Sequence, residues 1–186
     1  MGTQYPSLEP VHEKFIAKQP IFFVGSAAST GLINVSPKGM DSLRILGPNR
    51  ILWRNLTGSG NETATHVATS PRMTLMWCAF EGPPMILRAY GTARAIFRQE
   101  PDWAELDDPH FAPDPAARQL FDVHIDMVQK SCGYAVPEMT FKAERDVLKT
   151  WAKTKGEDGI HEYWATRNAT TLDGVETQIV ARNLGK

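Results

Sequence analysis

The sequence is poor in the features that mark specialised classes of protein. It contains only two cysteines, Cys78 and Cys132, which lie far apart and have no second pair of metal ligands nearby. A disulfide framework and a zinc site are therefore not indicated, and Cys132 is expected to be a small buried residue. No apolar run approaches the length of a membrane span, and the start of the sequence has no basic-then-apolar leader. We therefore expect a cytoplasmic protein in a reducing setting, with no membrane partner.

An excess of charge of one sign is also lacking. The 20 Lys and Arg residues are balanced by 21 Asp and Glu residues, which gives a formal net charge of −1. This balance argues against nucleic acid or an anionic membrane as the main partner. The 186 residues are 42% hydrophobic and contain no repeat or low-complexity tract. They are sufficient for one globular domain with an appended element.

Residue patterns for catalysis by the protein itself are scarce. The five histidines show no metal-ligand spacing, and no Ser-His-Asp order or pair of carboxylates stands out. If the chain performs chemistry, we expect a bound cofactor to supply it.

Residues 50–67 have the pattern of a strand, a glycine loop and the start of a helix. Residues 51–53 are apolar and follow a Gly-Pro-Asn turn, and the helix must end before Pro71. Between them, Gly58 and Gly60 allow a tight bend that brings unpaired N–H groups to the positive end of the helix dipole. Such a loop is typical of an anion site, most simply one for phosphate.

A purely structural interpretation of the same loop competes with this one. Ser59 and Glu62 have the spacing of a capping box, in which both side chains only satisfy backbone N–H groups at the helix start. Spacing alone favours the capping box over a ligand site. The loop is also not a P-loop, since no Lys-Ser/Thr pair follows its second glycine, and Thr63 stands where a dinucleotide fingerprint would have its last glycine.

The remaining sequence predicts short strands interrupted by helices. Alternation and turn signals predict six strands, at residues 21–27, 32–36, 42–46, 50–56, 73–80 and 85–97. Periodicity and caps predict helices at residues 7–18, 61–69, 114–129, 143–155 and 158–168. Residues 99–113 are expected to form a loop, and residues 177–181 a final strand or a loose tail. This order favours a mostly β fold, an antiparallel barrel with peripheral and C-terminal helices, over a βαβ arrangement.

Two of these predictions rest on particular residues. The helix at 114–129 begins with Asp114 as a cap and Pro115 at the first helical position. Its apolar stripe consists of Leu120, Val123, Met127 and Val128. Between the two C-terminal helices, Gly156 suits a left-handed cap.

Several segments, in this order along the chain, carry a resemblance to a known family. They are INVSPKG at 33–39, NLTGSGNET at 55–63, CAFEGPP at 78–84, RAYG at 88–91, SCGY at 131–134 and NATTLDG at 168–174. Together they resemble the pyridoxamine 5′-phosphate oxidase-related, FMN-binding split-barrel family, and the last two are typical of one branch of it. The resemblance implies a six-stranded antiparallel FMN-binding split barrel. It also implies a homodimer with two FMN sites at its interface.

The resemblance also implies a set of cofactor-binding residues. In the family, a basic residue from an early strand and polar groups around the strand-to-helix loop hold the FMN phosphate. The matching positions here are Lys38, Ser36, Asn55, Ser59, Asn61 and Thr63, with Gly58 and Gly60 in the loop itself and Pro37 beside the lysine. A phosphate dianion needs a cation and several N–H or O–H donors, which this set provides. Arg54 and Arg88 are predicted flavin or substrate contacts, with solvated surface arginines as the alternative.

Departures from the family pattern limit the functional prediction. The C-terminus lacks the basic Arg-x-His element that binds substrate phosphate in pyridoxamine phosphate oxidases, so vitamin B6 oxidation is not expected. An FMN-dependent oxidoreductase acting on an unidentified small molecule is the first hypothesis. A flavin-binding or redox-sensing module without turnover is the second, and a haem- or deazaflavin-binding split-barrel protein is the third. We assign residues 1–136 to the barrel with an N-terminal and a crossing helix, and 137–186 to a helical extension packed on the barrel or the dimer partner.

Overall fold

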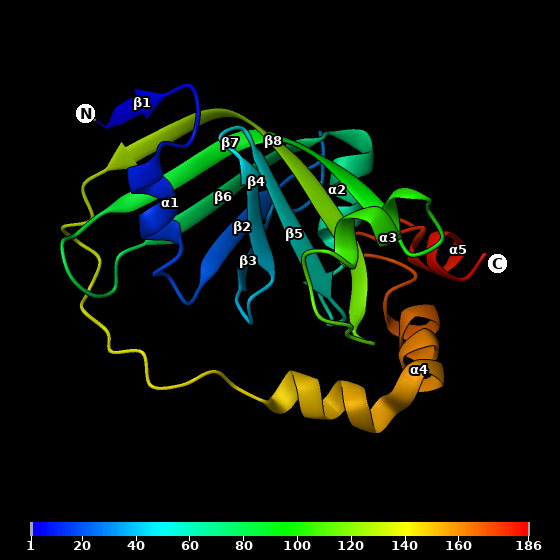
Figure 1. Cartoon of the computed structure of the whole chain (residues 1–186). Helices are drawn as coiled ribbons and strands as arrows, with labels where there is room; N and C mark the ends of the chain where they lie inside the picture. Colours follow the sequence, from blue (N-terminus) through cyan, green and yellow to red (C-terminus); the bar gives the residue numbers. More distant parts are fainter. Residues whose placement is uncertain (1, 186) are drawn as a thin grey trace.

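The computed structural model describes residues 2–185, whose strands form one curved antiparallel sheet (Figure 1). The strands are β1 (Thr3–Tyr5), β2 (Phe22–Ser26), β3 (Asn34–Lys38), β4 (Leu43–Gly47), β5 (Arg50–Leu56), β6 (Arg72–Cys78), β7 (Ile86–Phe97) and β8 (Ala117–Ser131). Their hydrogen-bonded order is β3-β2-β6-β7-β8-β5-β4, and β1 pairs with β8. β3 and β4 are the two ends of this order although they follow each other in the chain. The sheet is therefore open between them.

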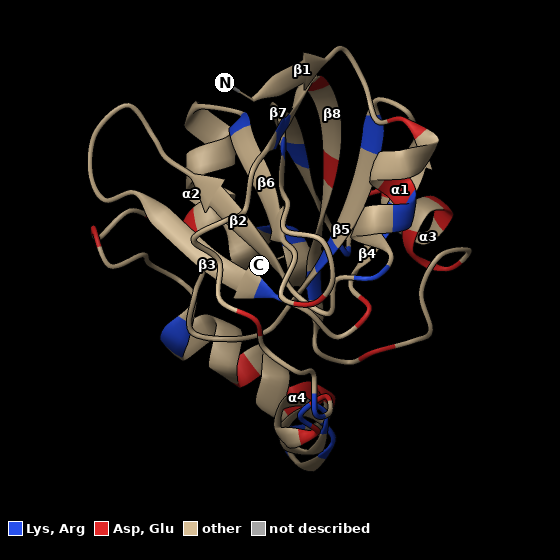
Figure 2. Ribbon diagram, turned by 90° about the vertical axis from the view of Figure 1, so that its left-hand side faces the viewer, with Lys and Arg blue, Asp and Glu red and all other residues tan. Residues whose placement is uncertain are grey.

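The described residues also form five helices, which lie around the sheet. They are α1 (Pro10–Ile16), α2 (Glu62–Thr69), α3 (Asp102–Asp107), α4 (Val147–Arg167) and α5 (Ile179–Leu184). None of them combines the length and apolar character that crossing a membrane requires. Basic and acidic residues are interspersed on the face that Figure 2 presents, in agreement with the balanced composition.

The predicted class is confirmed, but the strand count is corrected from six to eight. The six predicted strands correspond to β2 through β7, and β1 and β8 are additional. The helix predicted at 114–129 is wrong, because that segment forms β8, which pairs with both β5 and β7. Its buried residues Phe121, Val123 and Ile125 alternate with polar residues, as in a strand with one face in the core. The helical spacing of the other apolar residues hid this period of two.

Aromatic side chains pack in the core that the curved sheet encloses. Trp53 stacks on Phe121 with 4.7 Å between ring centroids, and Phe22 contacts Trp77 at 6.1 Å. Aromatic pairs of this kind add about 1 kcal/mol each beyond the area that they bury. Ile160 and Ile179, from the C-terminal helices, belong to the same buried cluster. The C-terminal segment therefore packs on the barrel.

Two connecting segments differ from their predictions. Residues 99–113 contain α3, because Trp103 and Leu106 pack on a small cluster of buried residues formed by Leu52, Ile96, Phe111 and Leu120. The tail predicted at 177–181 as a strand or a loose segment instead begins α5, whose Ile179 is buried.

The two helices predicted in the C-terminal region are present as the two halves of α4, which meet at a kink at Gly156, and the first of them begins at Val147 instead of residue 143. Residues 132–146 run from the end of β8 to α4, whose first half lies apart from the strands in the view of Figure 1 but contributes Ala152 to the buried core. Gly156 bends α4 with φ 63° and ψ −179°. The positive φ agrees with the choice of glycine there, but the extended ψ means that the residue is not a left-handed cap.

Candidate functional site

The glycine loop lies between β5 and α2, as predicted, but its capping differs. α2 begins at Glu62, and its N-cap Asn61 makes no side-chain capping bond. Glu62 Oε2 accepts the N–H of Asn61 at 3.1 Å, and Ser59 is exposed. Ser59 has no hydrogen-bond partner among residues 2–185, so the capping box predicted for it is not formed.

The two loop glycines are not required by backbone conformation. Neither Gly58 nor Gly60 has a positive φ. A Cβ at Gly58 would meet no atom within 4 Å, and at Gly60 it would lie 3.7 Å from the Glu62 carboxylate. The absence of side chains at these positions therefore leaves space above the loop, through which a ligand could approach the backbone.

The guanidinium of Arg118 binds two backbone carbonyl groups of this loop. Its Nη1 donates to the carbonyl oxygen of Gly58 at 3.2 Å, and its Nη2 donates to that of Gly60 at 2.6 Å. The side chain is completely buried, and this burial lowers its pKa to about 10. Arg118 lies where the pairing of β5 with β8 shifts register, between the paired residues Ala117 and Gln119. Such a bulge redirects one side chain out of the normal alternation.

The C-terminal segment also forms hydrogen bonds with the glycine loop and with Thr57, the residue before it. Asn168 accepts a hydrogen bond from Arg118 at 2.7 Å through Oδ1 and donates to the Gly58 carbonyl at 3.0 Å through Nδ2. Trp164 donates its indole N–H to Thr57 at 2.9 Å, just before the loop. Because these groups are buried and mutually paired, the loop is held in one arrangement before any ligand binds.

One face of β3 presents polar groups toward the start of α2. Asn34, Ser36 and Lys38 alternate along this strand, so their side chains share one face. Asn34 donates to Thr63 Oγ1 at 2.9 Å, which ties β3 to α2. Ser36 Oγ is buried and has no hydrogen-bond partner within residues 2–185. An orphaned buried hydroxyl is costly unless another molecule satisfies it.

Lys38 is the cation of this face and has no acidic partner within 4.0 Å in the described chain. Its Nζ lies 5.3 Å from the centroid of the Trp53 ring, a cation–π arrangement. Burial lowers the pKa of Lys38 to about 8, the positive charge of Arg118 adds to this effect, and Glu62 opposes it. The amine is therefore desolvated without being neutralised, and a bound anion would stabilise its charged form.

These residues fit a phosphate group. Ser36 offers an unused hydroxyl, Lys38 an uncompensated cation, and the loop a surface without side chains at Gly58. Glu62 is the one opposing charge at the helix start, and it already accepts the Asn61 N–H. No group of metal-ligating side chains occurs among the residues that the structure describes.

The other predicted residues near the loop are already engaged or buried. Asn61 donates through Nδ2 to the carbonyl of Thr170 at 2.8 Å. Thr63 Oγ1 receives bonds from both Asn34 and Ser26. Asn55 is 5% exposed on β5, and Pro37 is exposed on β3. Their assignment to cofactor binding stays a prediction.

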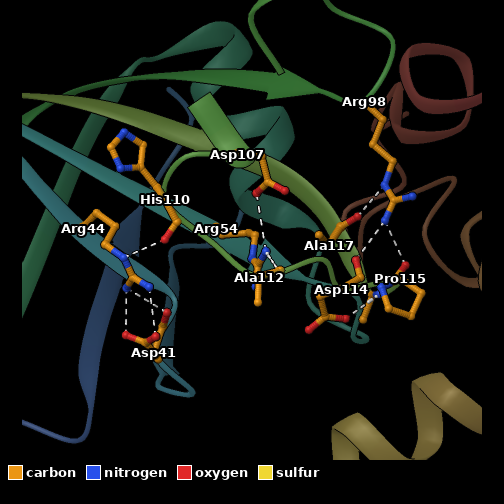
Figure 3. Close-up of polar contacts among 11 residues, drawn as sticks. Asp41, Arg44, Arg54, Arg98, Asp107, His110, Ala112, Asp114, Pro115 and Ala117 are labelled. Carbon is orange, nitrogen blue, oxygen red and sulfur yellow. Dashed lines mark hydrogen bonds and ion pairs between the residues drawn. The ribbon is translucent and has the colours of Figure 1, made fainter. Parts of the chain in front are cut away.

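The structure does not bring the two predicted arginines to this loop. Arg54 donates to the Ala112 carbonyl at 2.7 Å and lies 3.6 Å from Asp107, in a buried ion pair (Figure 3). Because Arg54 follows Trp53 on the same strand, the two side chains point to opposite faces. Arg88 donates to Ser131 at 3.2 Å across β7 and β8.

Sequence reasoning missed two residues that shape the site, Arg118 and Asn168. Arg118 fell in the segment predicted as a helix, where nothing distinguished it from a surface arginine. Asn168 opens one of the segments that carry the family resemblance, and that was the only signal for it. Cys132 also differs from its prediction, because it is exposed instead of buried.

Comparisons with known proteins extend these observations. The sequence profile described as pyridoxamine 5′-phosphate oxidase matches residues 8–132, more than half of the chain. The pyridoxamine 5′-phosphate oxidase family protein ustO of Aspergillus flavus is 32% identical over 202 residues, which cover 94% of this chain and 77% of ustO.

Two solved structures share the fold at low sequence identity. One is a candidate pyridoxamine 5′-phosphate oxidase of Lactobacillus delbrueckii, with a TM-score of 0.53, 13% identity, and coverage of 68% of this chain and 97% of that one. The other is a variant of HupZ from Group A Streptococcus, with a TM-score of 0.51, 15% identity, and coverage of 66% and 98%. The matched profile, the identity to ustO and the shared fold agree, and the chain belongs to the pyridoxamine 5′-phosphate oxidase family.

Proposed function

We propose that this protein binds FMN and is an FMN-dependent oxidoreductase acting on a small molecule other than a vitamin B6 phosphate. The observation that carries the proposal is the pair formed by the uncompensated Lys38 amine and the unpartnered Ser36 hydroxyl on one face of β3. Both groups belong to the face of β3 whose Asn34 bonds to α2, the helix that follows the glycine loop. A phosphate monoester would provide both a negative charge for the Lys38 amine and a hydrogen-bond acceptor for the Ser36 hydroxyl.

Each residue of the site has a separate task in this proposal. Lys38 neutralises the phosphate, Ser36 donates its hydroxyl proton to a phosphate oxygen, and Gly58 leaves room for that phosphate beside the backbone. Arg118 and Asn168 act as positioning residues, since they bind the loop carbonyls and leave the N–H groups to the ligand. Bound FMN would supply the hydride or electron transfer, and the protein would supply binding and orientation.

The first test compares FMN with riboflavin, which has the same ring system and no phosphate. We expect FMN to bind at least about tenfold more tightly, because only FMN can pair with Lys38 and Ser36. Fluorescence titration of the cofactor-free protein measures both affinities. Equal affinities would contradict the phosphate site, and a haem or deazaflavin absorption spectrum in the purified protein would contradict the choice of cofactor.

Turnover is tested apart from binding. Reduction of the bound flavin by NADH or NADPH under anaerobic conditions supports an oxidoreductase. A flavin that binds tightly but stays oxidised with either donor supports the alternative of a storage or redox-sensing module. The cytoplasmic setting also stays part of the proposal, and the two cysteines, which are unpaired, agree with it.

We also propose that the protein is an isologous homodimer. Exposed apolar residues gather around the edge strand β3. Leu32 and Ile33 lie in the segment that leads into β3, Val35 lies on it, and Leu172 and Val175 lie in the loop after α4, with exposures from 50% to 83%. The Leu32 N–H donates to Asp173 at 2.8 Å, so the segment before β3 and the loop after α4 are in contact. An exposed apolar edge of this kind is a liability in a monomer. Light scattering at micromolar concentration should give twice the monomer mass, and a monomer that still binds FMN would contradict the dimer.

A further inference from the structure

A pocket lies between the end of β7, α3 and the C-terminal helices, and none of the residues that line it belongs to β3. Its volume is about 510 Å³, and its lining includes Arg98, Trp103, Glu157, His161 and Leu184. None of these residues takes part in the phosphate site described above. The pocket therefore needs a separate explanation.

Arg98 is the cation of this pocket, and only carbonyl oxygens bind it. Its Nε donates to Ala117 at 2.7 Å, and its Nη2 donates to Asp114 at 3.2 Å and to Pro115 at 3.0 Å (Figure 3). Within residues 2–185, no acceptor is found for Nη1 and no carboxylate lies within 4.0 Å of the guanidinium. Nη1 of Arg98, which carries two N–H groups, therefore has no hydrogen-bond acceptor among the described residues, and Arg98 lines the pocket.

The surroundings of Arg98 make an anion a favourable partner. The guanidinium lies over Trp103 and Trp164, at 5.9 Å and 5.4 Å from the ring centroids, and burial lowers its pKa. Glu157, Asp107 and Asp114 act on its charge only at longer range, and its hydrogen bonds all go to neutral carbonyls. A desolvated cation of this kind gains more from a directly bound anion than an exposed arginine does. Beside it, Asn183 accepts the Arg98 backbone N–H at 2.9 Å, while its own buried Nδ2 has no partner among the described residues.

The other residues that line the pocket indicate what the uncharged part of the ligand is like. Trp103 and Leu184 are apolar, so a ligand that only carries charge, such as inorganic phosphate, would leave them uncovered. We propose that this pocket binds a small organic carboxylate with a flat apolar body, whose carboxylate pairs with Arg98 and whose body lies against Trp103 and Leu184. Arginine suits a carboxylate because its planar N–H groups match that planar anion.

Glu157 provides the means to test this assignment. Its carboxylate lines the pocket, lies 3.9 Å from His161 Nε2, and is 73% exposed in its side chain. Its negative charge opposes a bound anion. Because it is exposed and near the helix surface, replacing it should leave the fold intact.

The experiment titrates benzoate into the whole protein by calorimetry, with the variants Glu157→Lys and Glu162→Lys. Both variants reverse one exposed charge on α4, but Glu162 is not part of the pocket lining. We expect Glu157→Lys to tighten benzoate binding about threefold or more and Glu162→Lys to leave it within about twofold. Equal effects of the two variants would overturn the assignment.

Two further measurements separate the carboxylate from the apolar body. Benzamide, a neutral analogue of benzoate, should bind at least about tenfold more weakly, and Arg98→Gln should weaken benzoate by a similar factor. Arg94→Gln is the matched control, since Arg94 lies on β7 and pairs with Asp102 outside the pocket. If benzoate does not bind the wild-type protein, or binds no better than benzamide, the pocket is not a carboxylate site. If Arg98→Gln fails to fold, the comparison of the two Glu→Lys variants still decides.

Discussion

Replacement of Arg118 by methionine is expected to lower the free energy of unfolding of the cofactor-free protein by about 2 kcal/mol. The substitution leaves two acceptors without their donor, the carbonyl of Gly60 and the Oδ1 of Asn168, while the carbonyl of Gly58 keeps its hydrogen bond from Asn168. Each buried group without a partner costs about 1 kcal/mol or more. Removing the cation also removes its desolvation, which is visible in the pKa lowered to about 10, so the net loss is smaller than the sum.

Urea denaturation at neutral pH measures this loss. The control is Arg50→Met, which removes an arginine from β5 that pairs with Asp122 at 2.9 Å and is 47% exposed. Exposed pairs contribute little, so the control should lose about 1 kcal/mol or less. FMN affinity of the Arg118→Met protein should fall as well, because the loop is no longer held. If both variants are equally stable, Arg118 does not support the loop.

The sequence identified the strands that have a period of two and a clear turn at each end. β6 and β7 are an example, since Leu87 and Ala89 face the core while Arg88 and Tyr90 face outward. β8 was not identifiable in this way. Its register shift, opposite Tyr90 and Gly91, breaks the alternation just where Met127 and Val128 suggested a helical stripe. A long strand that pairs on both sides is fixed by its neighbours, and those contacts are not local in sequence.

The candidate site was predictable where it depended on local chain geometry and not where it depended on which face a side chain takes. The glycine loop followed from its position between a strand and a helix. Arg54 and Lys38 were both plausible basic residues in sequence, but alternation along β5 sends Arg54 to Asp107, while Lys38 lies over Trp53. Arg118, which reaches the loop, lies at the register shift between β5 and β8, where no residue of β5 is paired with it. Such a placement cannot be inferred without knowing the strand pairing.

Replacement of Lys38 by methionine should separate ligand binding from stability, because the two should change in opposite directions. FMN binding should weaken by about 2 kcal/mol, roughly thirtyfold, through loss of a charge-assisted hydrogen bond to the phosphate. The cofactor-free protein should become more stable at pH 7, by about 2 kcal/mol, because a desolvated cation is replaced by an apolar side chain of similar length. A lysine with a structural role would instead lose stability when removed.

The stability change expected for Lys38→Met depends on pH, because the pKa of Lys38 differs between the folded and unfolded states. The pKa of Lys38 in the folded protein is about 8, below the ordinary value of 10.5, so the folded state disfavours the charged amine. The resulting cost is fully present below pH 8 and disappears as the pH rises through 10.5. The stability gained by Lys38→Met should therefore be largest near neutral pH and vanish in alkaline solution. Lys18→Met, at an exposed position, should show no such trend. A stability difference for Lys38→Met that is independent of pH would mean that the amine is solvated, and an anion would then gain nothing by binding it.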